Sequence, residues 1–253
     1  MLDTRRSGDI LEIRLARPPV NALNPELLTG LRDAVRAAPG DGARGIVIAG
    51  GPKVFSAGLD VPHLLTLDRP DLEAAWRVFF EAAHTIAASP VPVVAAIAGH
   101  CPAGGCVLAL CCDYRVMAEG DFRIGLNEVE VGLAVPEGIQ HLMRRVIGPY
   151  RAERLLVSGA MVDAATAHGL GLVDELAPAE AVDARAQAWL ADLLRRPAAP
   201  MLATRRLARA DLVEALEDPV RAGVEGFIEG WYAPQTQAVL KALVERLKGG
   251  KPG

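Results

Sequence analysis

The sequence predicts an α/β fold in which helices wrap a largely parallel sheet. Short apolar runs alternate with amphipathic helical runs through the first half of the chain. Two of the apolar runs, residues 45–49 and 92–98, contain almost no polar side chain, as is usual for strands that are buried on both faces. Residues 71–88 between them have helical periodicity. This strand–helix–strand order is typical of a parallel sheet.

The other elements follow from local signals in chain order. Residues 10–16 alternate apolar and charged side chains, which predicts a half-exposed strand. The Asn-Pro-Glu sequence at 24–26 has the residue types preferred at a helix N-terminus, so we expect an amphipathic helix over 27–37. A further apolar helix is expected at 107–112 and a short strand near 172–175.

The chain divides into a mixed core and a helical C-terminal part. Residues 179–248 are expected to form helices separated by prolines. The apolar faces of such a long helical stretch need a surface to pack against, and a neighbouring subunit is one candidate for it. We therefore place a core that holds the functional site at 1–195 and an oligomerisation region at 196–253. The separating prolines are Pro197, Pro200, Pro219 and Pro234.

Composition excludes several classes of protein. The chain has 253 residues, 51% of them hydrophobic, and a net charge of −4, so it lacks the basic character of most nucleic-acid-binding proteins. No apolar run approaches the ~20 residues of a membrane helix. The N-terminal sequence shows no apolar signal core, which predicts a cytoplasmic protein.

A metal site is not predicted. The cysteines Cys101, Cys106, Cys111 and Cys112 lie within one Ala/Gly/Leu-rich stretch, without the paired CxxC clusters of zinc sites. The 5 histidines form no HExxH motif. Small buried thiols in a reducing compartment are the expected state of these cysteines.

Two familiar motifs can be set aside. Residues 40–45 match G-x-G-x-x-G, but they follow a helix and precede a strand, whereas a dinucleotide fingerprint follows a strand and opens a helix. We expect a loop there. No GxxxxGK[ST] sequence occurs, and Ser56 has Val54 where a nucleophile elbow carries glycine.

Two glycine-bearing loops remain, and each follows an apolar strand. They span residues 54–61 and 99–106, and the second leads into the apolar helix. Ligands bind beyond the carboxyl ends of the strands in open α/β sheets. A free helix N-terminal amide at Gly104 and one amide from the first loop would form an oxyanion hole. The spacing alone fits ordinary glycine turns equally well.

Three segments carry a resemblance to a known family. The chain resembles the enoyl-CoA hydratase/isomerase (crotonase) superfamily and, within it, the mitochondrial-type Δ3,Δ2-enoyl-CoA isomerases. PPVNALNPELLTGL upstream and GLGLVDELAP downstream extend the likeness over nearly the whole chain. The segments are VFSAGLDV, GHCPAGGCVLALCCDYRVMAE and FRIGLNEVEVGL.

The resemblance implies a fold and a ligand. It implies a crotonase-like spiral of ββα units with a C-terminal helical trimerisation region, assembled as a homotrimer or a dimer of trimers. The implied ligand is an acyl-CoA, so CoA enters as part of the substrate and no cofactor is expected.

The resemblance also implies site residues. The oxyanion amides fall on Ala57 and Gly104, and the catalytic acid/base falls on Glu128. The other positions implied to contact the substrate are Gly58, Leu59, Asp60, Val61, Asn127 and Arg246. For Asp60 and Arg246 a structural role, as a turn carboxylate and a surface helix charge, is the competing interpretation.

One departure from the hydratases favours isomerisation. Hydratases of this superfamily carry two glutamates, and the first falls on Val107 here. Hydration needs one carboxylate to activate water and another for the α-proton, whereas isomerisation needs a single proton carrier. The predicted activity is conversion of 3-enoyl-CoA to trans-2-enoyl-CoA, with Glu128 desolvated by Val107, Leu126 and Val129.

Alternatives stay open at this level. Glu137, in a Pro-Glu-Gly sequence resembling that of the peroxisomal-type isomerases, is a possible second acid or the base itself. A hydratase-like enzyme or another acyl-CoA lyase could use Glu137 with Glu128. A catalytically idle acyl-CoA-binding protein would also have this fold. Glu130 is expected to be solvated or ion-paired.

Overall fold

A computed structural model describes residues 1–217 and 223–249. The strands are β1 (Leu2–Ser7), β2 (Ile10–Leu15), β3 (Gly45–Ala49), β4 (Val93–Ile97), β5 (Cys101–Pro102), β6 (Tyr114–Ala118), β7 (Arg123–Gly125), β8 (Val162–Asp163) and β9 (Glu175–Ala177). The helices are α1 (Pro25–Ala37), α2 (Val61–Leu64), α3 (Arg69–Ala87), α4 (Gly104–Leu110), α5 (Glu137–Ile147), α6 (Pro149–Ser158), α7 (Ala164–Leu170), α8 (Val182–Leu193), α9 (Ala198–Ala208), α10 (Ala210–Glu217), α12 (Val224–Tyr232) and α13 (Pro234–Gly249), with 3-10 helices η1 (Glu128–Val131) and η2 (Ala179–Ala181).

The main sheet has the order β1-β2-β3-β4-β6-β9. From β2 to β9 all neighbours pair in parallel, which confirms the predicted parallel sheet, and only β1 pairs antiparallel with β2. The turn between β1 and β2 uses Gly8 at φ 58°. Connections between the parallel strands run through helices, as parallel pairing requires.

A smaller sheet, β5-β7-β8, lies next to the first. After β4 the chain adds β5 to this small sheet and then begins α4, and after β6 it adds β7 in the same way. A strand in the main sheet, a short strand beside it and a helix therefore recur along the chain. This is the ββα unit expected from the sequence resemblance.

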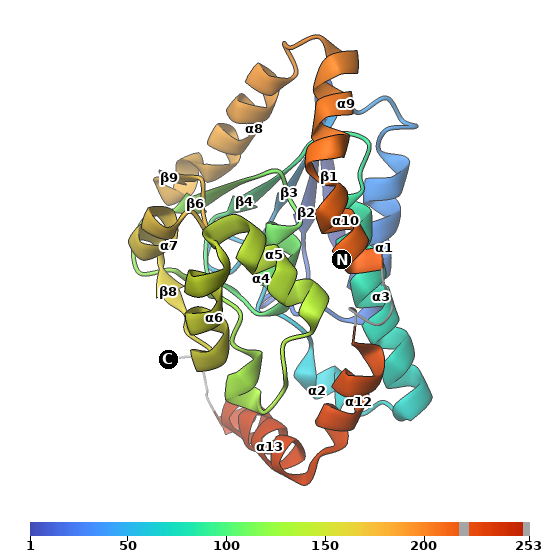
Figure 1. The fold of residues 1–253 in the computed structure, drawn as a ribbon, viewed down its shortest axis with the longest axis vertical. Helices are drawn as coiled ribbons and strands as arrows, with labels where there is room; N and C mark the ends of the chain where they lie inside the picture. The colour runs from blue at the N-terminus through green and yellow to red at the C-terminus, as the bar shows by residue number, and fades with distance from the viewer. Residues whose placement is uncertain (218–222, 250–253) are drawn as a thin grey trace.

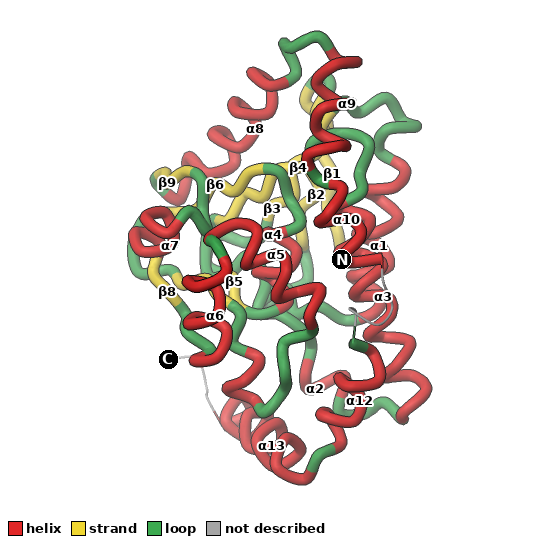
Figure 2. The backbone as a smooth tube through the Cα atoms, in the orientation of Figure 1, coloured by secondary structure: helices red, strands yellow, loops and turns green. Residues whose placement is uncertain are grey.

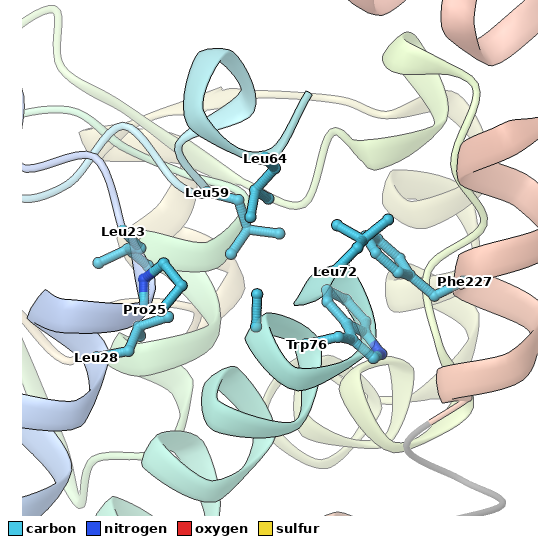
Figure 3. Close-up of a pocket in the computed structure, with 9 residues that line it drawn as sticks. Leu23, Pro25, Leu28, Leu59, Leu64, Leu72, Trp76 and Phe227 are labelled. Carbon is cyan, nitrogen blue, oxygen red and sulfur yellow. The ribbon is translucent and has the colours of Figure 1, made fainter. Parts of the chain in front are cut away.

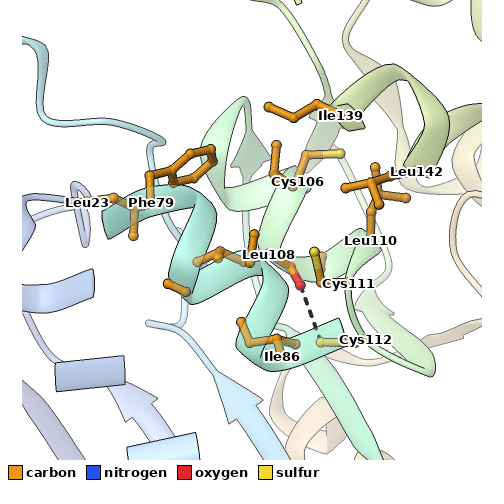
Figure 4. Close-up of a cluster of buried hydrophobic side chains, with 14 of the residues drawn as sticks. Leu23, Phe79, Ile86, Cys106, Leu108, Leu110, Cys111, Cys112, Ile139 and Leu142 are labelled. Atoms are coloured by element: carbon orange, nitrogen blue, oxygen red, sulfur yellow. Dashed lines mark hydrogen bonds between the residues drawn. The ribbon is translucent and has the colours of Figure 1, made fainter. Parts of the chain in front are cut away.

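The two faces of the main sheet are covered differently. Side chains such as Val47, Val94 and Val116 pack against Ala186 and Leu190 of α8. The opposite face packs against α1, α3, α4 and α5 in the larger core cluster. Figures 1 and 2 show the sheet in the middle, with α8 and α9 at one end and α12 and α13 at the other. In Figure 4, Cys106 of α4 and the two cysteines that follow this helix, Cys111 and Cys112, lie among the apolar side chains of the larger core.

Several local predictions are confirmed and some boundaries move. Asn24 caps α1 by accepting a hydrogen bond from Leu27 N at 2.9 Å, and β3 forms at the predicted residues. The loop is confirmed over residues 40–44, and Gly45 begins β3. The helix predicted at 107–112 begins three residues earlier, at Gly104. The strand predicted at 172–175 lies three residues later, because Leu172 and Val173 are buried in the preceding turn.

Side-chain hydrogen bonds join the C-terminal helices to the core. Arg205 makes two hydrogen bonds to Asp113, at 2.7 and 2.8 Å, and Arg209 donates to Cys111 O at 2.6 Å. The proposed division at 195/196 lies in the connection between α8 and α9. Pro219, expected to separate helices, lies outside the described residues. No helix in residues 1–217 or 223–249 combines the length and apolar character needed to cross a membrane.

Candidate active site

A cavity of about 380 Å³ opens where the two glycine-bearing loops meet the C-terminal helices. The first loop contributes Ala57, Leu59 and Val61, and the start of α4 contributes Gly104. The rest of the wall is mainly apolar and comes from helices that lie far apart in the sequence and from the loop before α5. Its large side chains are Trp76, Phe79, Leu133, Ile139, Phe227 and Trp231.

The first loop presents a different amide from the one predicted. Ala57 N–H donates to Val20 O at 2.9 Å, so this amide is not available to a ligand and its assignment to an oxyanion hole is wrong. Leu59 forms an isolated parallel bridge with Leu23, in which the flanking Gly58 O and Asp60 N bond to Leu23. The Leu59 N–H has no acceptor among the described residues, and Leu59 lines the cavity.

The second amide is where the sequence predicted it. Gly104 is the first residue of α4, so its N–H has no acceptor within the helix, and none of the described residues supplies one. Ala103, directly before it, has φ 46°, a left-handed conformation that is strained for alanine. Its own N–H is fixed to Gly125 O at 2.8 Å.

The two loops approach each other so closely that only glycine fits. A Cβ on Gly58 would lie 3.0 Å from Ala103 Cβ and 3.2 Å from Gly104 N, and Gly58 has φ +83°. A Cβ on Gly105 would lie 2.8 Å from Ser56 O. The glycines therefore set the spacing between the amides of Leu59 and Gly104.

The remaining residues of the first loop have supporting positions. Gly58 and Asp60 are not part of the cavity wall. Asp60 is 7% exposed, pairs with Arg17 at 2.5 Å and caps α2 by accepting from His63 N at 3.1 Å. Ser56 is buried, and its hydroxyl donates to Asn21 O and accepts from Gly58 N.

Glu128 is the first residue of η1 and faces the cavity. Its Oε2 is buried without a hydrogen-bond partner among the described residues. Burial raises the pKa of this carboxyl to about 7, against a smaller opposing effect of its own backbone N–H. A carboxyl that titrates near neutrality can both take up and release a proton.

The predicted apolar surround of Glu128 is partly wrong. Val107 and Leu126 are fully or almost fully buried, but Val129 is 38% exposed and projects toward Gly159. Cys106 lies near enough for the Glu128 charge to contribute to raising the pKa of its thiol, although burial is the main cause.

The other two candidate acids, Glu137 and Glu130, differ in their position relative to the cavity. Glu137 is the first residue of α5 and pairs with Arg144 at 2.9 Å, and its side chain is 47% exposed. Its neighbour Pro136 lines the cavity but Glu137 does not. From the sequence, Glu130 was expected only to be solvated or ion-paired. In the structure it is exposed and also lines the cavity.

Two further predicted contact residues line the cavity. Asn127 precedes Glu128, and no hydrogen bond to a described residue occupies its side-chain amide. Arg246 comes from α13 and is exposed. Within the described residues, no group of three or more His, Cys, Asp or Glu is placed to hold a metal ion.

The aromatic part of the wall was missed by the sequence analysis. Trp76 and Phe79 lie on the buried face of α3, at a spacing that any core helix has. Phe227 and Trp231 are likewise on the buried face of α12. No local signal distinguishes these side chains from ordinary core residues.

Known proteins resemble this chain over nearly its full length. The sequence model of the enoyl-CoA hydratase/isomerase family matches residues 5–249. The human mitochondrial enoyl-CoA delta isomerase 1 is 32% identical over 99% of this chain and 84% of its own length. A probable enoyl-CoA hydratase from Mycobacterium avium (strain 104) is 33% identical over 92% of this chain and 91% of its own length.

The fold comparison agrees with the sequence comparison. The crystal structure of human mitochondrial delta3-delta2-enoyl-CoA isomerase superposes with a TM-score of 0.93 at 31% identity, covering 98% of each chain. This confirms the crotonase-like fold. A family match of this extent, together with relatives above 30% identity, places the chain firmly: it belongs to the enoyl-CoA hydratase/isomerase family.

Proposed function

We propose that this enzyme is a 3-enoyl-CoA isomerase that moves the double bond to the trans-2 position. The observation that carries the proposal is the Glu128 carboxyl, which has a pKa of about 7 and a buried Oε2 without a hydrogen-bond partner among the described residues. It lines the same cavity as Leu59 and Gly104, whose N–H groups meet no acceptor in the described part of the chain. This arrangement supplies one proton carrier and a site for one oxyanion.

The proposed reaction uses these groups in sequence. The thioester oxygen accepts hydrogen bonds from the N–H groups of Leu59 and Gly104. Ionised Glu128 removes a proton from C2, and the negative charge passes to the thioester oxygen as a dienolate forms. Glu128 then returns the proton to C4, so that the double bond lies between C2 and C3. Each amide donor typically contributes about 3 kcal/mol to stabilising such an oxyanion.

Hydration of 2-enoyl-CoA is the second candidate. Glu130 also lines the cavity, and one of the relatives described above is named as a probable hydratase. Val107, at the position of the first hydratase glutamate, supplies no carboxyl and is completely buried. Isomerisation is favoured because Glu130 is exposed, whereas burial raises the pKa of the Glu128 carboxyl to about 7.

The decisive experiment replaces Glu128 by glutamine. Glu128→Gln keeps the size of the side chain but cannot accept the C2 proton, so turnover of 3-enoyl-CoA should fall by about 10²–10⁴-fold. Affinity for a saturated acyl-CoA should change little, because both amides remain. Turnover of 3-enoyl-CoA and 2-enoyl-CoA should be measured side by side, with binding measured by calorimetry.

Glu137→Gln and Glu130→Gln are the matched controls. We expect Glu137→Gln to retain most of its turnover, since its carboxylate pairs with Arg144 outside the cavity. If Glu130→Gln alone abolishes activity, or if the wild type hydrates 2-enoyl-CoA faster than it isomerises 3-enoyl-CoA, the hydratase candidate replaces our proposal. Binding without any turnover would indicate an idle acyl-CoA-binding protein.

The remaining functional assignments follow from this proposal. CoA enters as part of the substrate, with Asn127 and Arg246 as contact residues, and the chemistry needs no cofactor. The cytoplasmic location stays a prediction from the sequence.

A further inference from the structure

Aromatic side chains from two helices make up part of the cavity wall. The chain has 5 Phe and 3 Trp, and five of these eight side chains form one connected cluster from α3 and α12. The cluster consists of Trp76, Phe79, Phe80, Phe227 and Trp231. A chain so poor in aromatic residues gathers them here, against the cavity.

Trp76 and Phe227 form the tightest contact in the cluster. Their rings are parallel within 4°, with centroids 3.6 Å apart, and they are 4% and 6% exposed. Phe79 stacks on Trp76 from the same helix at 5.4 Å, and Phe80 meets it edge-on at 5.4 Å. The Trp76–Phe227 pair joins α3 to α12, and two further rings of α3 contact Trp76.

A second, much smaller space has this pair in its lining as well. It has a volume of only about 10 Å³ and a wholly apolar lining that includes Leu28, Leu64 and Leu72 (Figure 3). Leu59, Trp76 and Phe227 are the residues that line both this gap and the 380 Å³ cavity. Since Leu59 also presents one of the free amides, the shared wall begins beside the reaction centre.

We propose that the Trp76–Phe227 pair is the end wall of the acyl-binding part of the cavity and sets the longest acyl chain that the enzyme accepts. This inference rests on the proposed acyl-CoA function. Methylenes in front of the wall are removed from water and strengthen binding. Methylenes beyond it would have to separate the stacked rings, because the gap behind holds no more than a water-sized volume.

The test measures binding as a function of chain length. In the wild type, dissociation constants for saturated acyl-CoAs of four to sixteen carbons should fall by about fourfold for each added methylene, because each methylene that leaves water strengthens binding by about that factor. This improvement should stop at a limiting chain length, which we call the limit. Trp76→Leu and Phe227→Leu should move this limit to longer chains by two or more carbons. The ratio of kcat/KM for long to short 3-enoyl-CoAs should rise in parallel.

Two control variants separate the wall from general packing. Phe80→Leu removes a ring of the same cluster that lines neither cavity, so it should lower the melting temperature without moving the limit. Leu72→Ala enlarges the gap behind an intact wall, so it should leave the limit in place when made alone. It should extend the limit further when combined with Trp76→Leu.

The possible outcomes test the end-wall proposal separately from the proposed isomerase activity. An unchanged limit in folded Trp76→Leu and Phe227→Leu, with isomerisation intact, overturns the wall and leaves the function standing. A limit that moves equally in Phe80→Leu also overturns it. A limit that moves in a protein without isomerase turnover supports the wall and rejects the isomerase. If the wild type binds no acyl-CoA, both proposals fail.

Discussion

In the proposed mechanism, the burial of Glu128 sets the pH at which the enzyme works. Only the ionised carboxylate would take up the substrate proton, and burial places the pKa of this group at about 7. We therefore expect kcat/KM for 3-enoyl-CoA to rise about tenfold per pH unit below pH 7 and to level off above it, since kcat/KM reports the free enzyme. A rate profile that is flat from pH 5 to 8 would contradict this assignment.

The same titration affects stability with a defined sign. The folded pKa of about 7 lies above the ordinary value of 4.5, so the bound proton favours the folded state. This stabilisation is complete below pH 4.5 and is lost as the pH rises through 7. Relative to Glu128→Gln, the wild type should lose roughly 3 kcal/mol of unfolding free energy over that range. Denaturant unfolding of both proteins at pH 5 and pH 8 measures the difference.

Single residues show where sequence reasoning succeeds and where it stops. Glu128 and Gly104 could be named from the sequence because their segments resemble a family and carry a carboxylate and a helix-starting glycine. The choice between Ala57 and Leu59 could not be made in this way. It depends on which amide the distant residues Val20 and Leu23 occupy, and that pairing leaves no trace in the loop itself.

At the scale of secondary-structure elements, the contact between the two glycine-bearing loops sets the spacing of the site. Gly58→Ala would place a methyl group 3.0 Å from Ala103 Cβ and force the loops apart. Since a displacement of about 1 Å at a reaction centre can reduce the rate on the order of 100-fold, kcat should fall by about that factor. Steady-state kinetics and thermal unfolding of the variant provide the measurement.

Gly8→Ala is the matched control for this prediction. Gly8 also has a positive φ, of +58°, but a Cβ there meets nothing within 4 Å. Both variants carry backbone strain of about 1–2 kcal/mol, because alanine is placed in the left-handed region, so both should lose some thermal stability. Only Gly58→Ala should lose turnover, and equal kinetics in the two variants would show that the close approach is unimportant.

Elements with strong periodicity could be predicted, and those without it could not. β3, β4, α1 and α3 each carry a local burial pattern, and all four form close to the expected residues. β1 is exposed along almost its whole length, so its side chains have no alternation to reveal a separate strand. The aromatic wall was missed because α3 and α12 are adjacent only in the folded chain.

At the scale of the whole molecule, we propose that α9 takes part in subunit association. This helix buries none of its residues, and its Leu207 is 72% exposed. Together with the sequence resemblance, this supports a homotrimer or a dimer of trimers as our proposed assembly. Sedimentation equilibrium at micromolar concentration should give a mass that is a multiple of three chains, and a stable monomer would contradict the proposal.

The C-terminal helices also determine when the site comes into existence. Phe227, Trp231, Leu243 and Arg246 line the cavity, yet they are translated long after Glu128 and both loops. Chains grow at roughly 5–20 residues per second and fold from the N-terminal side. On the ribosome, the sheet and the proposed proton carrier can therefore be in place for several seconds while the cavity stands open to water. During that interval the nascent chain has the groups of our proposed mechanism but no enclosed place for the proposed acyl tail.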